Sequence, residues 1–501
     1  MKLAGTIRST PVRGFGAPAL VASLAALLLI GAVIAARVSP ALFVVAGLGL
    51  IAVVAFAAAR WPRTTIVVVV LSPLFDRYVV ADVLPPALEA MAHLLSEAML
   101  LAVGLVIATR AWFAGRLVEA LRHPVTAGLL AFAAIGGISA VLNGVPPLIA
   151  LTGLLFTLDA AILFFLPRLV GFTLRQSLLA VGAVMAIVLG AAVLAIAQAI
   201  LSPRILGLDP VRGRFGELQR LASIFGDPNV FGAFLVVAAP FALLMAIHLP
   251  TARLRRIAGV AAFIVILALW LSFSRGAWIA IVLGVGVVLA ILDRRALLLG
   301  LGICVLSFAT AIFMPRDLLV ARAPGTSTDR PDPIGSTIDR VGTVGVGGDL
   351  RTLFILNAIT IVRDHPLLGV GPGRYGGAVA DNYGTPIYEE YGTDRLFWNP
   401  QQRTVDNFWL HILVETGIVG FLTFLATAML PGLRILSAAR TSRGLRRIML
   451  GGTAAATAGL AISSLTTMLL EANTIGFPFW FLLGVGGLVA AAARGEPAQS
   501  T

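Results

Sequence analysis

Apolar residues fill long, nearly uninterrupted runs of this 501-residue chain, and polar residues gather in the segments between the runs. The runs hold roughly 17–25 residues, the length that a helix needs to cross the ~30 Å hydrocarbon core of a bilayer. Because backbone groups inside lipid must be paired within their own segment, these runs are expected to be helices. The pattern predicts about fourteen spans, with approximate bounds 17–36, 40–59, 64–80, 88–109, 125–141, 147–166, 176–201, 229–248, 256–272, 276–292, 297–314, 405–430, 448–470 and 475–494.

The composition points to the same class of protein. Hydrophobic residues make up 59% of the chain and charged residues 12%, whereas soluble globular domains are about 25% charged. We therefore predict an all-α polytopic membrane protein of about 12–14 transmembrane helices. The first run follows Lys2, Arg8 and Arg13 as in a signal peptide, but its length favours a retained anchor. The single cysteine, Cys304, excludes an intrachain disulfide.

The net charge of +13 would suggest a nucleic-acid partner in a soluble protein, but membrane topology explains it. If the N-terminus is cytoplasmic, the inner segments carry most of the Lys and Arg, including the clusters at 253–256 and 443–447. The acids in those inner segments are Glu119, Asp293 and Glu496. The positive-inside rule then places both termini in the cytoplasm, and no nucleic acid is needed to explain the charge.

Two outer connections, 202–228 and 315–404, are much longer than the others. Connections of this length are usually functional or disordered. Within the second, 350–366 has the apolar periodicity of a helix too short to span, and 369–377 is a glycine-rich turn. We expect three parts: a bundle of about eleven spans, a large extracytoplasmic loop containing short helices, and about three C-terminal spans, at 1–314, 315–404 and 405–501.

Arg275 is the only formally charged residue within 257–292. A central arginine costs about 2.5–3.5 kcal/mol in a spanning helix. If the stretch breaks at the Ser-Arg-Gly sequence 274–276, it forms two spans of ordinary length, and the arginine lies at their shared outer turn. There it either reaches lipid headgroups or belongs to an anion site.

Polar residues also mark the start of the twelfth predicted span. Asn407, His411 and Glu415 recur every four residues, so they line one helical face that descends from the outer surface. Intramembrane His and Glu are candidate functional groups, and the alternative is a hydrogen-bonded pair that only holds the bundle. For Glu97 and Asp159, which are lone acids in other spans, the packing role is favoured.

Signatures of metal and nucleotide sites are missing. The segment 369–377 lacks the Gly-Lys-Ser/Thr of a P-loop, and the chain contains no His-Glu-x-x-His and no Asp-x-Asp pair suited to a sugar nucleotide. The five histidines are scattered. We therefore expect neither a metal nor a cofactor.

Four motifs nevertheless occur in a recognisable order between residues 215 and 430. They are an arginine ahead of a Pro-Asn-x-Phe turn, the Ser-Arg-Gly turn, an arginine followed by His-Pro and Gly-Val-Gly-Pro-Gly, and Asn-x-x-Leu followed by Glu-x-Gly-x-x-Gly, at 220–231, 274–276, 351–375 and 407–420. In this set the chain resembles the O-antigen ligase and polymerase superfamily of bacterial membrane glycosyltransferases. From the residues alone, Asn229 is as well explained as a helix N-cap.

The resemblance implies a glycan donor linked through a diphosphate to a polyprenyl lipid, bound at the outer face of the cytoplasmic membrane. In similar sites two arginines bind the diphosphate, and the matching residues here are Arg220 and Arg275. Guanidinium groups suit phosphate oxygens because they present paired N–H donors. The motif residues Asn229, Asn407 and Glu415 are expected to be structural.

A general base is expected, because the acceptor hydroxyl must lose a proton. The ligases are given a histidine directly before the last-motif asparagine, whereas this chain has Asp406 there. The base therefore stays open among Asp406, His411 and His365, and the departure favours a polymerase that extends lipid-linked repeat units. The loop residues expected to contact the glycan are Arg351, Arg374, Tyr391 and Trp398. Stacking on acceptor sugars and ordinary loop packing explain the aromatic residues equally well, at Tyr383, Tyr388, Tyr391 and Trp398.

Two other functions stay open at this point. A ligase would move finished glycan to a lipid or protein acceptor, and a flippase would move lipid-linked sugars without breaking the diphosphate bond. Against the flippase, the chain has no clear repeat of matched halves, and alternating access does not need so long an outer loop. The expected partners are the lipid-linked glycan, its acceptor and membrane lipids.

Overall fold

A computed structural model of the protein describes residues 39–83, 86–200, 211–212, 219–313, 350–397 and 403–494. The first helices described are α2 to α9, at Pro40–Arg60, Pro62–Val83, Pro86–Phe113, Leu117–Leu121, Pro124–Leu142, Pro147–Leu158, Ile162–Val170 and Leu174–Ile200. A two-residue antiparallel ladder follows, β1 at Val211–Arg212 and β2 at Gln219–Arg220. Next come α10 to α14, at Pro228–His248, Ala252–Leu271, Arg275–Ile279, Val287–Leu292 and Arg294–Phe313. The last are α17 to α22, at Leu350–Asp364, Ala378–Tyr383, Pro386–Glu390, Phe408–Thr441, Gly444–Ser463 and Asn473–Ala493.

Within these described residues, eleven helices are long and apolar enough to cross a membrane. The protein is therefore an all-α polytopic membrane protein, as the hydrophobic pattern predicts. The predicted first span, 17–36, lies outside the described residues. The predicted span 448–470 is α21, which ends earlier, at Ser463, and is followed by a connection to α22.

The helix α21 is not among the eleven apolar spans, and its surroundings explain why. Most of its residues are buried, and it packs against α10, α20 and α22. Small residues allow this: an added Cβ at Gly452 would lie 2.4 Å from Phe241, and one at Gly459 would lie 2.5 Å from Val236. A helix enclosed by protein does not need an apolar surface for lipid, and close packing of small residues holds it instead.

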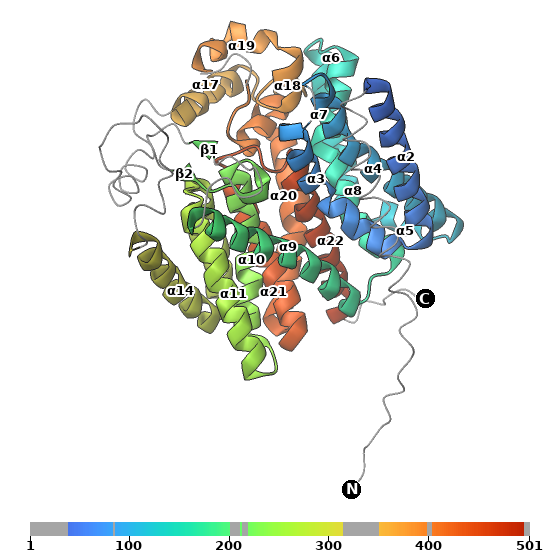
Figure 1. Ribbon diagram of the computed structural model, residues 1–501. Helices are drawn as coiled ribbons and strands as arrows, with labels where there is room; N and C mark the ends of the chain where they lie inside the picture. The colour runs from blue at the N-terminus through green and yellow to red at the C-terminus, as the bar shows by residue number, and fades with distance from the viewer. Residues whose placement is uncertain are drawn as a thin grey trace.

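The three C-terminal helices join two groups of helices. In Figure 1, α20, α21 and α22 run through the middle, between α2–α8 on one side and α10, α11 and α14 on the other, and α9 crosses the middle. The helix α22 packs on α3 and α8, whereas α21 packs on α10 and on the π-helical turn η4, residues Ala280–Gly286. The site described below therefore draws on segments distant in sequence.

Residues 350–397 form a cap over one end of the bundle (Figure 1). We call this end the capped face, and the end that carries the α10–α11 turn the uncapped face. The helix predicted over 350–366 is α17, and it contacts α20. At the uncapped face Asp293 lies 2.6 Å from Nε2 of His248 and 3.7 Å from Arg447, so this acid is paired with basic groups.

Candidate active site

The glycine-rich segment of the cap enters a break in α20. The backbone of Gly417 has a φ of 64° and a ψ of −173°, which interrupts the helix. The N–H groups of Val370 and Gly371 donate to the carbonyls of Val414 and Glu415, at 3.0 and 2.9 Å. Below the break, the N–H groups of Ile418 and Val419 donate to the carbonyls of 366 and 367. The cap thus replaces hydrogen bonds that the helix loses.

Glycine is required on both sides of this junction. Gly369 and Gly417 have positive φ values of 68° and 64°. A Cβ at Gly369 would lie 2.4 Å from the carbonyl oxygen of Val414, and one at Gly417 would lie 2.3 Å from the backbone of Leu367. No side chain can be accommodated there, because the obstruction is backbone. The motif glycines therefore fix how the cap sits on α20.

The first two sequence motifs meet at the capped face. The guanidinium of Arg220 donates to Oδ1 of Asn229 at 2.8 Å, and its Nε donates to the carbonyl of Ser272 at 3.3 Å. The hydroxyl of Ser274 donates to the same Asn229 oxygen at 3.2 Å. Asn229 is not the N-cap of α10. That position belongs to Asp227, whose Oδ1 accepts from the N–H groups of 229 and 230. Asn229 is instead the polar link between the two motifs.

The Ser-Arg-Gly turn separates two helices, as predicted. The helix α11 ends at Leu271, and α12 begins at Arg275 with Ser274 as its N-cap. Between them, Phe273 has a φ of 49°, a left-handed conformation that is strained for a bulky residue and is typical of functional sites. Arg275 is half-buried in this turn. On the opposite side of the turn, a Cβ at Gly276 would lie 1.9 Å from the Thr466 hydroxyl oxygen, so the α21–α22 connection also borders the site.

Asp406 lies next to Arg351 and within electrostatic reach of Arg220. One of its carboxylate oxygens accepts from Arg351 of α17 at 3.1 Å, and the Asp406 side chain is 50% exposed. Protein packed around the other half desolvates the carboxylate and raises its pKa, and the Arg351 guanidinium opposes that shift. The charge of Asp227 also raises the pKa of Asp406, and the charge of Arg220 lowers it. The base candidate before Asn407 is therefore in the same electrostatic neighbourhood as Arg220.

His411 and Glu415 lie deeper, beneath the glycine-rich segment. Nδ1 of His411 hydrogen-bonds the Tyr375 carbonyl, and Oε1 of Glu415 accepts the Tyr375 N–H at 2.8 Å. The two side chains are 3.7 Å apart, and Nε2 of His411 lies 3.9 Å from Glu471. Both His411 and Glu415 are buried, at 3% and 2% exposure. The pair thus binds the cap to α20. Asn407 caps the helix by accepting from the N–H of Leu410.

The remaining loop candidates are distributed over the cap. Arg374 donates to the Gly144 carbonyl at 3.5 Å, next to the α6–α7 turn. The Tyr391 hydroxyl donates to Asp364 at 2.9 Å, while burial and that carboxylate raise the Tyr391 pKa to about 12. Tyr388 is 1% exposed, and its hydroxyl accepts from the Gly376 N–H and donates to the Arg403 carbonyl. Tyr388 is therefore part of the cap's core.

Tyr383, by contrast, is 59% exposed, and Trp398 lies outside the described residues. His365 follows α17, and its backbone N–H and carbonyl bond to 361 and 369. The carbonyl of Pro366, the next residue, accepts a hydrogen bond from the N–H of Ile418. Ile418 lies ten residues after the start of α20, which is about 15 Å along the helix at 1.5 Å per residue. His365 is therefore on the far side of the cap junction from Asp406.

Two acids at this site escaped the sequence reasoning. Glu471 accepts the N–H of Ala378 at 3.0 Å and faces His411, and Asp227 caps α10 while acting on Asp406. The sequence contained a signal for Asp227, because Asp before Pro-Asn is a strong N-cap. It contained no signal for Glu471, because the partners of Glu471, His411 and Ala378, lie about 60 and 90 residues away in the chain. Within the described residues, no group of three His, Cys, Asp or Glu side chains is arranged to hold a metal ion.

Comparison with known protein families gives a match that covers three of the four motifs, those at 274–276, 351–375 and 407–420. The family model described as O-antigen ligase matches residues 260–425, which include the Ser-Arg-Gly turn, the cap and the broken part of α20. Among curated proteins no significant match to the chain exists. Eleven apolar helices together with this domain indicate a multi-pass membrane protein. The chain thus contains an O-antigen ligase domain, which supports its assignment to the O-antigen ligase and polymerase superfamily.

Proposed function

We propose that the protein is a polymerase that joins glycan repeat units carried on polyprenyl diphosphate, acting without a metal at its capped face. The positive charge of the α10–α11 turn and of the residues around 443–447 favours the uncapped face as cytoplasmic. The capped face would then be the outer face of the cytoplasmic membrane. The observation that carries the proposal is the joining of Arg220, Asn229 and Ser274 beside Asp406.

In the proposed reaction an acceptor sugar hydroxyl attacks the anomeric carbon of the donor. The new C–O glycosidic bond forms as the bond from the anomeric carbon to the diphosphate oxygen breaks. The hydroxyl proton passes to a base, and polyprenyl diphosphate leaves with the bonding electron pair. Negative charge therefore builds on the leaving group, and the enzyme must stabilise it there.

Arg220 and Arg275 are the groups proposed to stabilise that charge. Arg220 is held by Asn229 and by the 272 carbonyl, so its guanidinium is positioned before substrate binds. Arg275 starts α12 at the strained turn that Ser274 links to the same Asn229. Pre-positioned guanidinium groups need little reorganisation when charge develops, and this is the condition for a large electrostatic contribution.

Asp406 is the proposed base, with Arg351 as its partner. It is exposed at the capped face, whereas His411 is enclosed and has Nδ1 bonded to Tyr375. A carboxylate with a raised pKa is a better proton acceptor than an ordinary one. The polymerase assignment also follows from this residue, because the ligases are given histidine at the matching position.

The direct test uses purified protein and a lipid-linked repeat unit. Two products are measured: free polyprenyl diphosphate and glycans of increasing length. A polymerase releases the diphosphate and makes a ladder of longer glycans without any added acceptor. Release that requires a separate lipid or protein acceptor would identify a ligase instead. Binding of the lipid-linked unit with no release would contradict transfer and favour a flippase.

A further inference from the structure

The described part of the molecule contains a cavity of about 220 Å3 far from the candidate active site. It is lined by Pro62, Arg63, Ile107, Arg110, Ala111, Arg116, Leu169 and Val170. These residues come from the start of α3, the end of α4, the α4–α5 connection and the end of α8. The cavity has space for several water molecules or one phosphate group. It cannot serve the reaction proposed above, because it lies at the other end of the bundle.

Its position follows from the path of the chain. The turn before α7 meets the cap, because Arg374 donates to Gly144 and Asn143 donates to the Gly369 carbonyl. From there Pro147–Val170 forms one apolar span of 24 residues, or about 36 Å at 1.5 Å per residue. Val170 is therefore at the uncapped face. The exposed Trp112 and Phe113 at the end of α4 are typical of the membrane–water interface.

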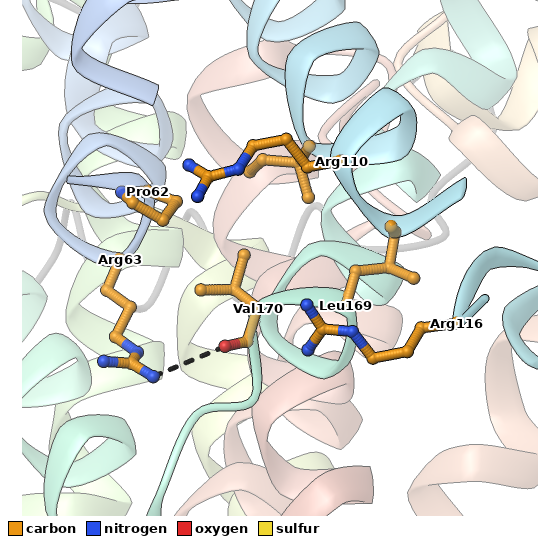
Figure 2. A pocket seen from close by; sticks show the side chains of 8 residues that line it. Pro62, Arg63, Arg110, Arg116, Leu169 and Val170 are labelled. Carbon is orange, nitrogen blue, oxygen red and sulfur yellow. Dashed lines mark hydrogen bonds between the residues drawn. The ribbon is translucent and has the colours of Figure 1, made fainter. Parts of the chain in front are cut away.

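Three arginines surround the cavity without an acid among its lining residues. Figure 2 shows Arg63, Arg110 and Arg116 placed around Leu169 and Val170. Like charges gathered at the rim of a partly apolar cavity repel one another, and a bound anion removes that repulsion. Three such arginines therefore point to an anionic ligand.

Among the described residues, hydrogen bonds use only part of the donor capacity of these arginines. Arg63 donates to the carbonyls of Val170 and Gly171 at 3.5 Å each, and Arg110 donates to the carbonyl of Ala59. These contacts cap the ends of α8 and α2, yet a guanidinium carries several N–H donors. Helix capping does not account for the position of Arg116, because its side chain lines the cavity and is exposed.

The surroundings of the arginines select the kind of anion. The cavity also presents Ile107, Ala111 and Leu169, which are buried apolar residues. The N-terminus of α3, at Pro62, opens onto the same space, and helix N-termini favour phosphate. A phosphate group with hydrocarbon attached matches both kinds of surface, and basic pockets between helices at the cytoplasmic face are typical sites for lipid headgroups.

We propose that this cavity binds the phosphate headgroup of an anionic phospholipid from the leaflet at the uncapped face. The site is separate from the proposed diphosphate site and does not depend on the glycosyltransferase mechanism. It gives the protein a lipid contact between α3, α4 and α8 that neutral lipids cannot replace.

The test is native mass spectrometry of the full-length protein in detergent with added phosphatidylglycerol or phosphatidylcholine. Wild-type protein is expected to retain phosphatidylglycerol in preference to phosphatidylcholine. Each of Arg63→Gln, Arg110→Gln and Arg116→Gln is expected to reduce the retained phosphatidylglycerol about fivefold. Arg116→Gln is the least disruptive variant, because its guanidinium caps no helix. Arg253→Gln is the matched control, since Arg253 is an exposed arginine at the same face.

Equal retention by Arg116→Gln and Arg253→Gln would overturn the proposal, as would equal retention of the two lipids by wild type. Millimolar inorganic phosphate distinguishes lipid from free anion. If phosphate displaces phosphatidylglycerol completely, the site is a phosphate site rather than a lipid site, and the proposal is wrong. Retention in the presence of phosphate supports it.

Discussion

At the scale of single residues, the Ser-Arg-Gly turn concentrates unusual features. Phe273 takes a left-handed backbone conformation, Ser274 caps α12, and the same hydroxyl bonds the Asn229 that holds Arg220. A conformation of this kind costs of order 1–3 kcal/mol and persists where surrounding contacts impose it. Placing Arg275 at the first position of α12 thus depends on a turn that the fold maintains at a cost in stability.

The first prediction concerns the shape of the Arg275 guanidinium. Arg275→Lys keeps the charge but loses the planar pair of donors that suits a diphosphate. We expect release of polyprenyl diphosphate to fall about 10–100-fold, since charge-assisted hydrogen bonds contribute about 1.5–3 kcal/mol. The control is Arg295→Lys, an exposed arginine at the uncapped face, which should retain activity. Full activity of Arg275→Lys at equal protein amounts would refute the role in diphosphate binding.

The second prediction concerns pH and the Asp406–Arg351 pair. The proposed base acts when deprotonated, so activity should rise as pH increases through the pKa of Asp406. Arg351 lowers that pKa, so Arg351→Gln should move the acid limb of the rate profile to higher pH. We expect a shift of up to about one pH unit, because the pair is partly exposed.

Arg363→Gln provides the matched control, since Arg363 is an exposed residue at the end of the same helix. Its acid limb should stay where it is in wild type. If Arg351→Gln also leaves the limb in place, Asp406 is not the group whose titration limits the reaction.

At the scale of secondary-structure elements, the break in α20 is the feature that joins the cap to the bundle. Backbone hydrogen bonds cross from the cap to both sides of Gly417. Beside the break, Glu415 accepts a bond from Tyr375, and His411 bonds the Tyr375 carbonyl. The cap is therefore fixed by main-chain pairing as well as by its own aromatic core of Phe354, Tyr375 and Tyr388.

The third prediction tests that junction with Gly417→Ala. The positive φ and the 2.3 Å approach of the Leu367 backbone leave no room for Cβ, so the substitution should loosen the cap. We expect a lower melting temperature and a decrease of about 1–3 kcal/mol in the free energy of unfolding. We also expect faster hydrogen exchange of the backbone N–H groups of 370, 371, 418 and 419. Gly259→Ala in α11 is the control, because nothing lies within 4 Å of its Cβ position. Equal exchange in both variants would contradict the junction.

At the scale of the whole molecule, the two faces differ in charge and in structure. The capped face carries the cap, the β-ladder and the candidate active site, whereas the uncapped face carries short turns with arginine clusters. The α20–α22 helices connect the two helix groups (Figure 1). The candidate active site consequently lies where both helix groups and the cap meet.

The fourth prediction tests the orientation with cysteine labelling. In a Cys304→Ala background, Tyr383→Cys marks the capped face, and Arg253→Cys marks the uncapped face. Both positions are exposed. A membrane-impermeant maleimide should label only Tyr383→Cys in intact spheroplasts and both variants after permeabilisation. Labelling of Arg253→Cys alone in intact spheroplasts would reverse the orientation derived from the positive-inside rule.

The fold class, most of the helix boundaries and the break before Arg275 were predictable from the amino-acid sequence. These follow from local physics: apolar length sets a span, and a charged arginine within an apolar stretch favours a turn at the membrane surface. The helix over 350–366 was predictable for the same reason, from its periodicity. The motif set around the outer loop also led to the family that the domain at 260–425 confirms.

The tertiary structure alone decided which polar residues meet. Asp406 pairs with Arg351, 55 residues away, and Glu471 reaches Ala378 across 93 residues. No local signal specifies such pairs, because they form only when the cap folds back onto the bundle. Tyr388, a candidate for sugar stacking by composition, is enclosed for the same reason. The arginine cavity at the uncapped face likewise exists only because three helix ends, distant in sequence, are packed together.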